Sequence, residues 1–110
     1  MAFAAYHNVT GSTGVNVELI AVGEGISSIN SIVIANTHAT ADATVSLFIQ
    51  NEPTAAAAST FYMFKTLAIP SDTSLLLDNK SMLSFDNSTV GYGLYLTVGS
   101  SDTLDVMINA

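Results

Sequence analysis

Hydrophobic and polar residues alternate with a period of two along most of this chain. One such segment places Val15, Val17 and Leu19 on one side, with polar residues between them. The pattern returns in residues 43–49 and 104–108, and turn-forming residues separate the segments. Period-two alternation is typical of half-buried β-strands, and no segment of useful length has the helical period. The chain is therefore predicted to be all-β.

Further strands are expected between these segments. Residues 26–35 predict a long, largely buried strand, and residues 82–85 predict a short one. Two more sets of apolar residues are each expected to share one face of a strand: Phe61, Met63, Leu67 and Ile69, and then Tyr92, Leu94, Leu96 and Val98. The long segment 50–60 contains a proline and is expected to be a loop.

About eight strands in one chain predict an antiparallel β-sandwich. The jelly-roll-like and the immunoglobulin-like strand orders both remain open, because the alternation does not say which strands pair. A chain of 110 residues is expected to form a single domain, 1–110, in which residues 1–10 are either a first strand or an extended N-terminal arm.

Charge is scarce and mostly negative. Nine carboxylates face only Lys65 and Lys80, which gives a net charge of −7, and charged residues make up 10% of the chain. Binding to nucleic acid needs a basic patch, and an anionic membrane surface also attracts basic residues, so we expect neither partner. Small neutral side chains must cover much of the surface. Because they lose little rotamer entropy on burial, they suit a subunit that is covered in an assembly.

Neither a cysteine nor a signal peptide is apparent. The absence of cysteine excludes disulfides, thiolate metal sites and cysteine nucleophiles. The first twelve residues lack a basic segment and an extended apolar run, so no signal peptide is expected.

The segment "NTHATADAT", residues 36–44, is the first candidate for a catalytic site because His38 and Asp42 lie four residues apart. Two strongly patterned strands flank it, and asparagine and aspartate favour turns by binding nearby backbone amides. We therefore interpret it as a hairpin turn that faces solvent or a neighbouring subunit.

The sequence gives little support for a metal site or a modification site. His7 has no partner at a metal-ligand spacing. Five aspartates fall mostly in turn sequences, which favours turn chemistry over calcium binding; they are Asp72, Asp78, Asp86, Asp102 and Asp105. Asn8 and Asn87 match the glycosylation sequon, which we expect to be incidental. We predict no catalytic, cofactor-binding or metal residues, no cofactor, and a protein that is not an enzyme.

The order of the segments resembles a group of small phage virion structural proteins from phages of marine and cyanobacterial hosts. The segments that carry the resemblance are "NVT" (8–10), "SIVIANTHATADATVSLFI" (31–49), "FYMFKTLAIPSDTSLLLD" (61–78) and "DTLDVMINA" (102–110). The resemblance implies a β-sandwich subunit of the virion, assembled in the host cytoplasm. It also implies a small cyclic homo-oligomer bound to the major capsid protein or to other virion subunits.

We therefore expect a decoration (cement) protein that binds outside the capsid shell and stabilises contacts between capsid subunits. A trimer at local threefold positions is the expected form. Aromatic residues are the expected contacts with other copies or with the shell: Phe61, Tyr62, Phe64, Tyr92 and Tyr95. The alternatives are a neck, tail or fibre component of the virion, and a carbohydrate- or cell-surface-binding module.

Overall fold

The computed structural model describes residues 4–11, 16–26, 28–51, 59–99 and 102–110, which form eight β-strands. The strands are β1 (Ala4–Thr10), β2 (Asn16–Ile20), β3 (Ser31–Asn36), β4 (Ala43–Gln50), β5 (Thr60–Ile69), β6 (Ser74–Leu77), β7 (Gly93–Val98) and β8 (Thr103–Asn109). The predicted all-β class is confirmed. Part of the expected loop at 50–60, including Pro53 and the alanine run, lies outside the described residues.

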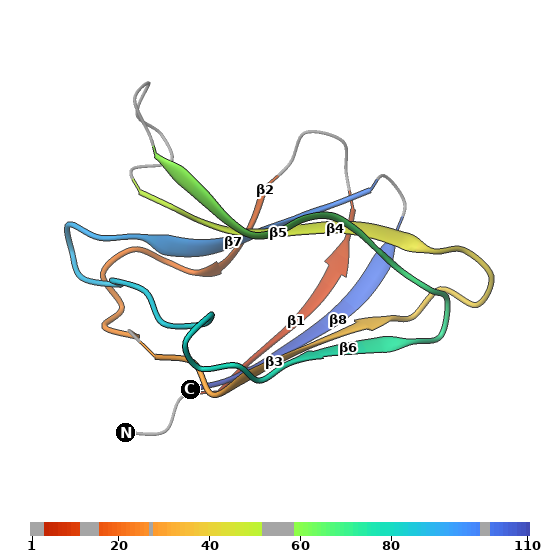
Figure 1. The fold of residues 1–110 in the computed structure, drawn as a ribbon. Coiled ribbons are helices and arrows are strands. Elements are labelled where there is room, and N and C mark those ends of the chain that lie inside the picture. The colour runs from red at the N-terminus through yellow and green to blue at the C-terminus, as the bar shows by residue number, and fades with distance from the viewer. Residues whose placement is uncertain (1–3, 12–15, 27, 52–58, 100–101) are drawn as a thin grey trace.

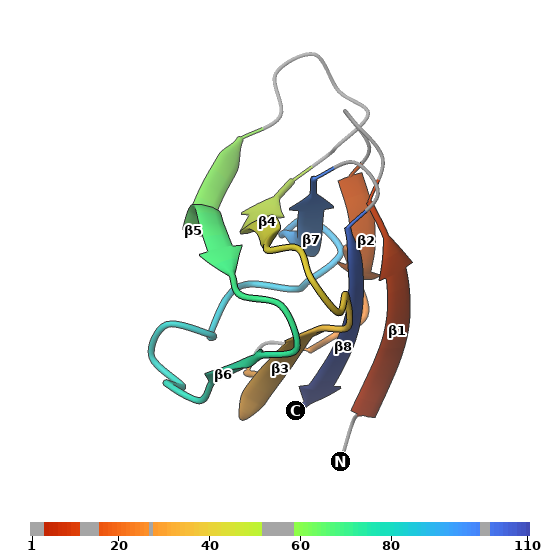
Figure 2. The same cartoon turned by 90° about the vertical axis from the view of Figure 1, so that its right-hand side faces the viewer.

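The strands form two four-stranded antiparallel sheets packed face to face (Figure 1). Sheet A has the order β1-β8-β3-β6, and sheet B has the order β2-β7-β4-β5. The first strand therefore pairs with the last, the second with the seventh, and so on inward. Figure 2 shows both orders from the end of the sandwich. The pairs β1-β8 and β3-β6 lie in sheet A, and the pairs β2-β7 and β4-β5 lie in sheet B. This alternation of strand pairs between two sheets is the jelly-roll arrangement. Of the two strand orders left open by the sequence, the jelly roll is the correct one.

The core lies between the two sheets and contains the apolar residues of the alternating pattern. Leu94, Leu96 and Val98 of β7 are buried, as are Leu104, Val106 and Ile108 of β8. Sheet A adds Ile32 and Ile34 from β3, and sheet B adds Val45 and Leu47 from β4. The prediction for these faces is confirmed. Their burial is the main source of the sandwich's stability, at about 25 cal/mol for each Å² of apolar surface removed from water.

Strand β5 departs from the alternation that its sequence predicts. Its pairing with β4 contains two β-bulges, where extra residues on β5 oppose the partner strand. Thr66 sits in one of these irregularities with a positive φ of 56°. The two extra residues cancel, so Phe61, Leu67 and Ile69 still lie opposite Ile49, Val45 and Ala43, the inward-facing positions of β4. Phe61 and Leu67 are nevertheless exposed, because β5 is an edge strand, while Ile69 is buried. The predicted shared face is therefore kept by Phe61, Leu67 and Ile69, whereas Met63 falls within a bulge and has no directly opposite residue on β4.

Two predicted strands also differ from the structure. Residues 26–35 do not form one long strand, since β3 begins only at Ser31. Residues 82–85 form turns with one isolated bridge, between Ser28 and Ser84. Leu83 and Phe85 are nevertheless buried. Their alternation with exposed neighbours was interpreted as a strand, but no neighbouring strand pairs with the segment continuously.

The segment around His38 is not a hairpin turn. It joins β3 of sheet A to β4 of sheet B, so residues 37–42 cross from one sheet to the other. Among the eight described strands, β4 and β5 are the consecutive pair that hydrogen-bond to each other. The sequence prediction of a turn was right, but the prediction that it closes a hairpin was wrong.

Candidate interaction surfaces

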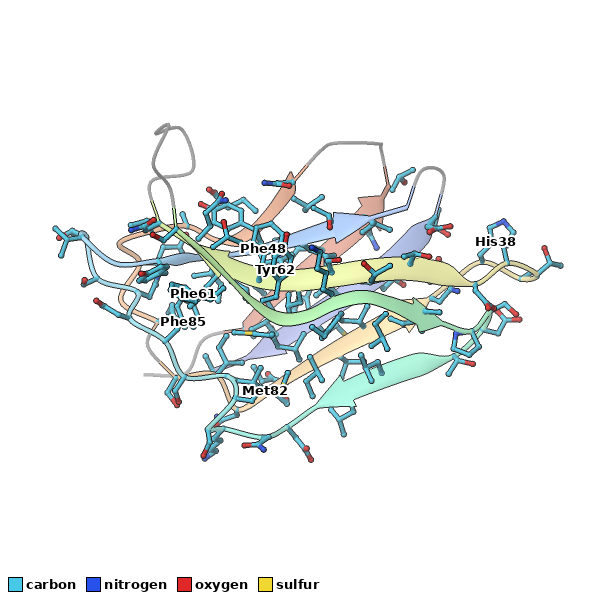
Figure 3. All side chains as sticks on the ribbon, turned by 45° about the horizontal axis from the view of Figure 1, so that its top comes forward. His38, Phe48, Phe61, Tyr62, Met82 and Phe85 are labelled. Atoms are coloured by element: carbon cyan, nitrogen blue, oxygen red, sulfur yellow. The ribbon has the colours of Figure 1, made fainter. Side chains whose placement is uncertain are left out.

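A row of three aromatic side chains crosses the outer face of sheet B. Tyr95 of β7, Phe48 of β4 and Tyr62 of β5 occupy directly opposite positions on neighbouring strands. The ring centroids of Phe48 and Tyr62 are 5.2 Å apart, and those of Phe48 and Tyr95 are 5.9 Å apart. Figure 3 shows Phe48 and Tyr62 side by side on this sheet. We call these three residues the aromatic row; cross-strand aromatic pairs of this kind stabilise sheets.

Charged groups lie at both ends of the aromatic row. Glu18 of β2 is directly opposite Tyr95, and the Lys65 ammonium lies 5.0 Å from the centre of the Tyr62 ring. Burial raises the pKa of Tyr95 above its usual value, and the nearby negative charge and hydrogen bonding of Glu18 raise this pKa further. A neutral Tyr95 hydroxyl is thus favoured in the folded protein, while Lys65 makes a cation–π contact.

The structure separates the five aromatic residues that were expected at an interface. Tyr62, 48% exposed, and Phe61 present large areas to solvent. Phe64 and Tyr92 are half-buried and pack against the core, and Tyr95 is only 4% exposed. Phe61 lies apart from the aromatic row, because its ring meets the Tyr92 ring with centroids 5.8 Å apart. Two of the five therefore offer a surface that a partner can reach.

The outer face of sheet A carries an exposed apolar surface that the sequence analysis did not identify. Tyr6 of β1 pairs with Met107 of β8, Met107 with Val33 of β3, and Val33 with Leu76 of β6. We call these four residues the apolar row. Tyr6 is 73% exposed and Leu76 is 57% exposed, and Met107 is exposed as well. The four come from distant parts of the chain, so alternation within one strand cannot reveal that they lie side by side.

A shallow concavity of about 250 Å³ lies beside the apolar row. Tyr6 and Met107 of the apolar row border it on one side. Asn8 and Asp105, which pair with each other two residues away along the same strands, border it on the other side. The Asn8 amide donates a hydrogen bond of 2.7 Å to the Asp105 carboxylate. His7 also borders the concavity, and its buried Nε2 has no hydrogen-bond partner among the described residues. His7 and His38 belong to different parts of the fold and form no joint site.

His38 has a structural role in the crossing segment, at the end of the sandwich seen in Figure 3. Its Nδ1 accepts hydrogen bonds of 3.1 Å from the backbone amides of Thr40 and Ala41. The Asn36 oxygen accepts a 3.0 Å bond from the His38 amide. The Asn36 amide donates 2.9 Å bonds to the carbonyls of Ala41 and Ile69. Asp42 is exposed and takes no part in these contacts. These contacts organise the crossing segment as a turn.

Asn87, the asparagine of the second sequon, holds a loop in the same way. Its amide donates to the carbonyls of Ala21 and Tyr92, at 2.8 and 2.7 Å, and its oxygen accepts a 2.9 Å bond from the Ile26 amide. The side chain is buried. In the folded protein this amide is therefore engaged in packing, and the sequon match at Asn87 reflects the needs of a loop.

The turn role predicted for the aspartates is seen at two of them, whereas Asp105 lies within β8 and bonds Asn8 of the neighbouring strand. Asp102 accepts a hydrogen bond from the Thr44 amide, and Asp86 accepts one from the Ser88 amide. The hydrogen bonds from Ser88 lower the pKa of Asp86 below its usual value. In the described part of the chain, no three histidine or carboxylate side chains gather where they could hold a metal ion. Within the same residues, no helix is long and apolar enough to span a membrane.

Comparison with known proteins adds one likeness of fold. No protein-family model matches the chain, and no curated protein sequence matches it. The jelly roll is similar to a chain in the structure of infectious bursal disease virus, Gx strain, with a TM-score of 0.52 and 11% sequence identity. The match covers 99% of this chain and 32% of the viral chain, so this protein spans about a third of the length of the viral one. The class is thus a jelly-roll β-sandwich with a viral structural neighbour.

Proposed function

We propose that the protein is a non-enzymatic structural subunit of a virus particle, of the phage decoration type. In this role it binds outside the capsid shell and stabilises contacts between capsid subunits. The observation that carries the proposal is the complete jelly-roll strand order, which matches a viral chain over 99% of this chain's length. Jelly rolls also occur in lectins and cupins, so the surface chemistry must support the choice.

The surface of the strands fits a subunit that is covered by neighbours. The strands of sheet A contain Asp105 as their one carboxylate and no lysine, and those of sheet B contain only Glu18 and Lys65 as charged residues. Contact with a shell protein would therefore bury little charge, which keeps the desolvation cost low. The remaining negative charge lies largely in the connections between strands, where it favours approach to a basic rim on the shell.

We place the shell contact at the exposed aromatic residues of sheet B, Phe61 and Tyr62. Aromatic side chains are enriched at interface hot spots because they bury a large area with few rotatable bonds. Tyr92 packs edge-on against Phe61, Tyr95 continues the aromatic row beyond Phe48, and Phe64 packs against the core. A neck, tail or fibre position on the same particle would use the same surface, so location on the particle distinguishes that alternative.

The test combines the purified protein with purified capsid shells that lack it. Co-sedimentation with the shells and a higher melting temperature of the shells are expected for the wild type. The variants Phe61→Ser and Tyr62→Ser should each weaken binding at least about tenfold. The matched control is Val90→Ser, because Val90 is 88% exposed but lies in the loop before β7. A wild-type protein that neither binds nor stabilises shells contradicts the decoration role.

A carbohydrate-binding role has one supporting observation, the exposed Tyr62 ring beside Lys65, on which a sugar could stack. Binding on a glycan array that is lost in Tyr62→Ser and kept in Val90→Ser would favour this role. Shell binding without glycan binding would exclude it.

A further inference from the structure

The apolar row on sheet A points to an interaction between copies of this chain. We propose that two copies pack their sheet A outer faces together, with the apolar rows in contact along a two-fold axis. The proposal concerns a different sheet from the proposed shell contact, and it does not depend on a role in a virus particle.

The composition of this face favours burial against another protein. Three of its four central residues, Tyr6, Met107 and Leu76, are exposed apolar side chains in the isolated protein. The flanking outward positions carry small or neutral polar side chains, including Ala4, Ser31, Ala35, Ser74 and Asn109. Asp105 is the single group that is charged at neutral pH among the outward-facing strand positions of sheet A, and Asn8 already hydrogen-bonds it. Covering this face therefore removes apolar surface from water at little electrostatic cost.

A second copy is the occupant that the arrangement of rows fits. A two-fold axis along the apolar row, perpendicular to the strands, places each residue of the row against the same residue of the second copy. It also exchanges the two flanking rows, so that Asp105 lies opposite Asn109 of the second copy, over the concavity. An asparagine amide can donate a hydrogen bond to a carboxylate. The two Asp105 carboxylates stay two rows apart, roughly 13 Å at about 3.4 Å of rise per residue, so they do not meet in the interface.

A two-fold axis parallel to the strands is less favourable. It would place Asp105 of each copy opposite Ala35 of the other, on adjacent central strands. Both carboxylates would then be buried close together without a donor from the second copy. The register of the flanking rows thus selects the first axis, and a self-complementary patch of this kind generates a closed dimer.

The same reasoning bears on the trimer expected from the sequence. A threefold ring uses two different patches on each copy, whereas sheet A offers one patch that complements itself. The structure therefore favours a two-fold contact. Four strands of four to seven residues give a footprint of roughly 20 × 20 Å on each copy, about 800 Å² in total, which is the size of a weak, reversible contact. We accordingly expect a dissociation constant in the micromolar range.

Sedimentation velocity over a series of protein concentrations tests the dimer. The wild type should convert from monomer to dimer as the concentration rises. Leu76→Glu and Met107→Glu should each weaken the dimer at least about tenfold, because the new carboxylate would be buried against the same carboxylate of the second copy. Val90→Glu adds the same charge outside the face and should leave the equilibrium unchanged. Circular dichroism confirms that each variant remains folded.

A charge introduced on the flanking row tests the axis itself. Asn109→Lys should tighten the dimer by placing an ammonium opposite Asp105 of the second copy, and the added change Asp105→Asn should abolish that gain. Val90→Lys controls for the change in net charge. A wild type that stays monomeric at every concentration would overturn the proposal. So would a dimer that ignores Leu76→Glu and Met107→Glu but is lost in Tyr62→Ser, since it would use sheet B.

Discussion

The side-chain amide of Asn36 donates a buried 2.9 Å hydrogen bond to the backbone carbonyl of Ile69, 33 residues further along the chain. Asn36 ends β3 in sheet A, and Ile69 ends β5 in sheet B. One side chain therefore ties the two sheets together at the end of the sandwich where the chain crosses between them. The same amide also holds Ala41 in the crossing segment.

Replacing Asn36 with alanine should lower the free energy of unfolding by about 3 kcal/mol, because it removes three hydrogen bonds and leaves a buried carbonyl without its donor. Urea denaturation followed by circular dichroism measures this change. Asn30→Ala is the matched control, since Asn30 is exposed, and it should cost less than about 0.5 kcal/mol. An equal, small effect of both substitutions would show that the Asn36 contacts contribute little to stability.

Asn87→Asp should lower the melting temperature by at least about 10 °C. Aspartate has nearly the same shape, but its carboxylate cannot donate to the carbonyls of Ala21 and Tyr92 and would instead face both oxygens. Asn79 provides the control, because its side-chain oxygen accepts bonds from the Ser81 and Met82 amides and its side-chain amide donates none among the described residues. Asn79→Asp keeps that acceptor and should melt within a few degrees of the wild type. Similar losses in both variants would contradict this account.

Tyr95 should make the protein sensitive to alkaline pH. Its pKa is raised in the folded state, so the folded protein holds this proton more tightly than the unfolded chain does. The resulting contribution to stability is fully present below the unfolded pKa of about 10 and is lost as the pH rises through the higher folded value. A phenolate absorbance titration should therefore show a late step, in which one tyrosine ionises above the ordinary tyrosine pKa of about 10.

Two variants identify that tyrosine. Tyr95→Phe should remove the late step, and Glu18→Gln should move it to lower pH because it removes the neighbouring negative charge. Tyr6→Phe, which changes an exposed tyrosine of the other sheet, should leave the late step in place. If Tyr95→Phe leaves the late step unchanged, the step does not belong to Tyr95 and the raised pKa of Tyr95 is contradicted.

Thr66 has a positive φ of 56°, a conformation that a β-branched residue rarely adopts. Asparagine tolerates this conformation better, so Thr66→Asn should raise the free energy of unfolding by up to about 1 kcal/mol. Thr44→Asn, at an exposed strand position of β4, should instead lower it slightly because asparagine is a poor strand residue. Denaturation curves of the two variants measure the contrast, and a loss of stability in both would argue against strain at Thr66.

Many of the strands could be predicted from the sequence, because the alternation of apolar and polar residues shows which side of a strand faces the core. In β7 and β8 this alternation sufficed, and Leu94, Leu96, Leu104 and Val106 are buried as expected. In β5 it was incomplete, because two bulges that the pattern does not reveal bring Phe64 opposite Leu47, and because Phe61 and Leu67 stay exposed on this edge strand. At 82–85 the alternation was present, but the long-range partner that makes a strand was missing.

The sequence by itself determined the all-β class, the apolar residues of the core and the scarcity of charge, because each depends on side-chain type and short-range spacing. The tertiary structure alone decided the jelly-roll order, the crossing at His38 and the rows that join Tyr6 to Leu76 and Tyr95 to Tyr62. The physical reason is that strands pair through backbone groups, which are the same in every residue. Which strands meet, and which exposed side chains become neighbours, therefore depends on how the whole chain packs.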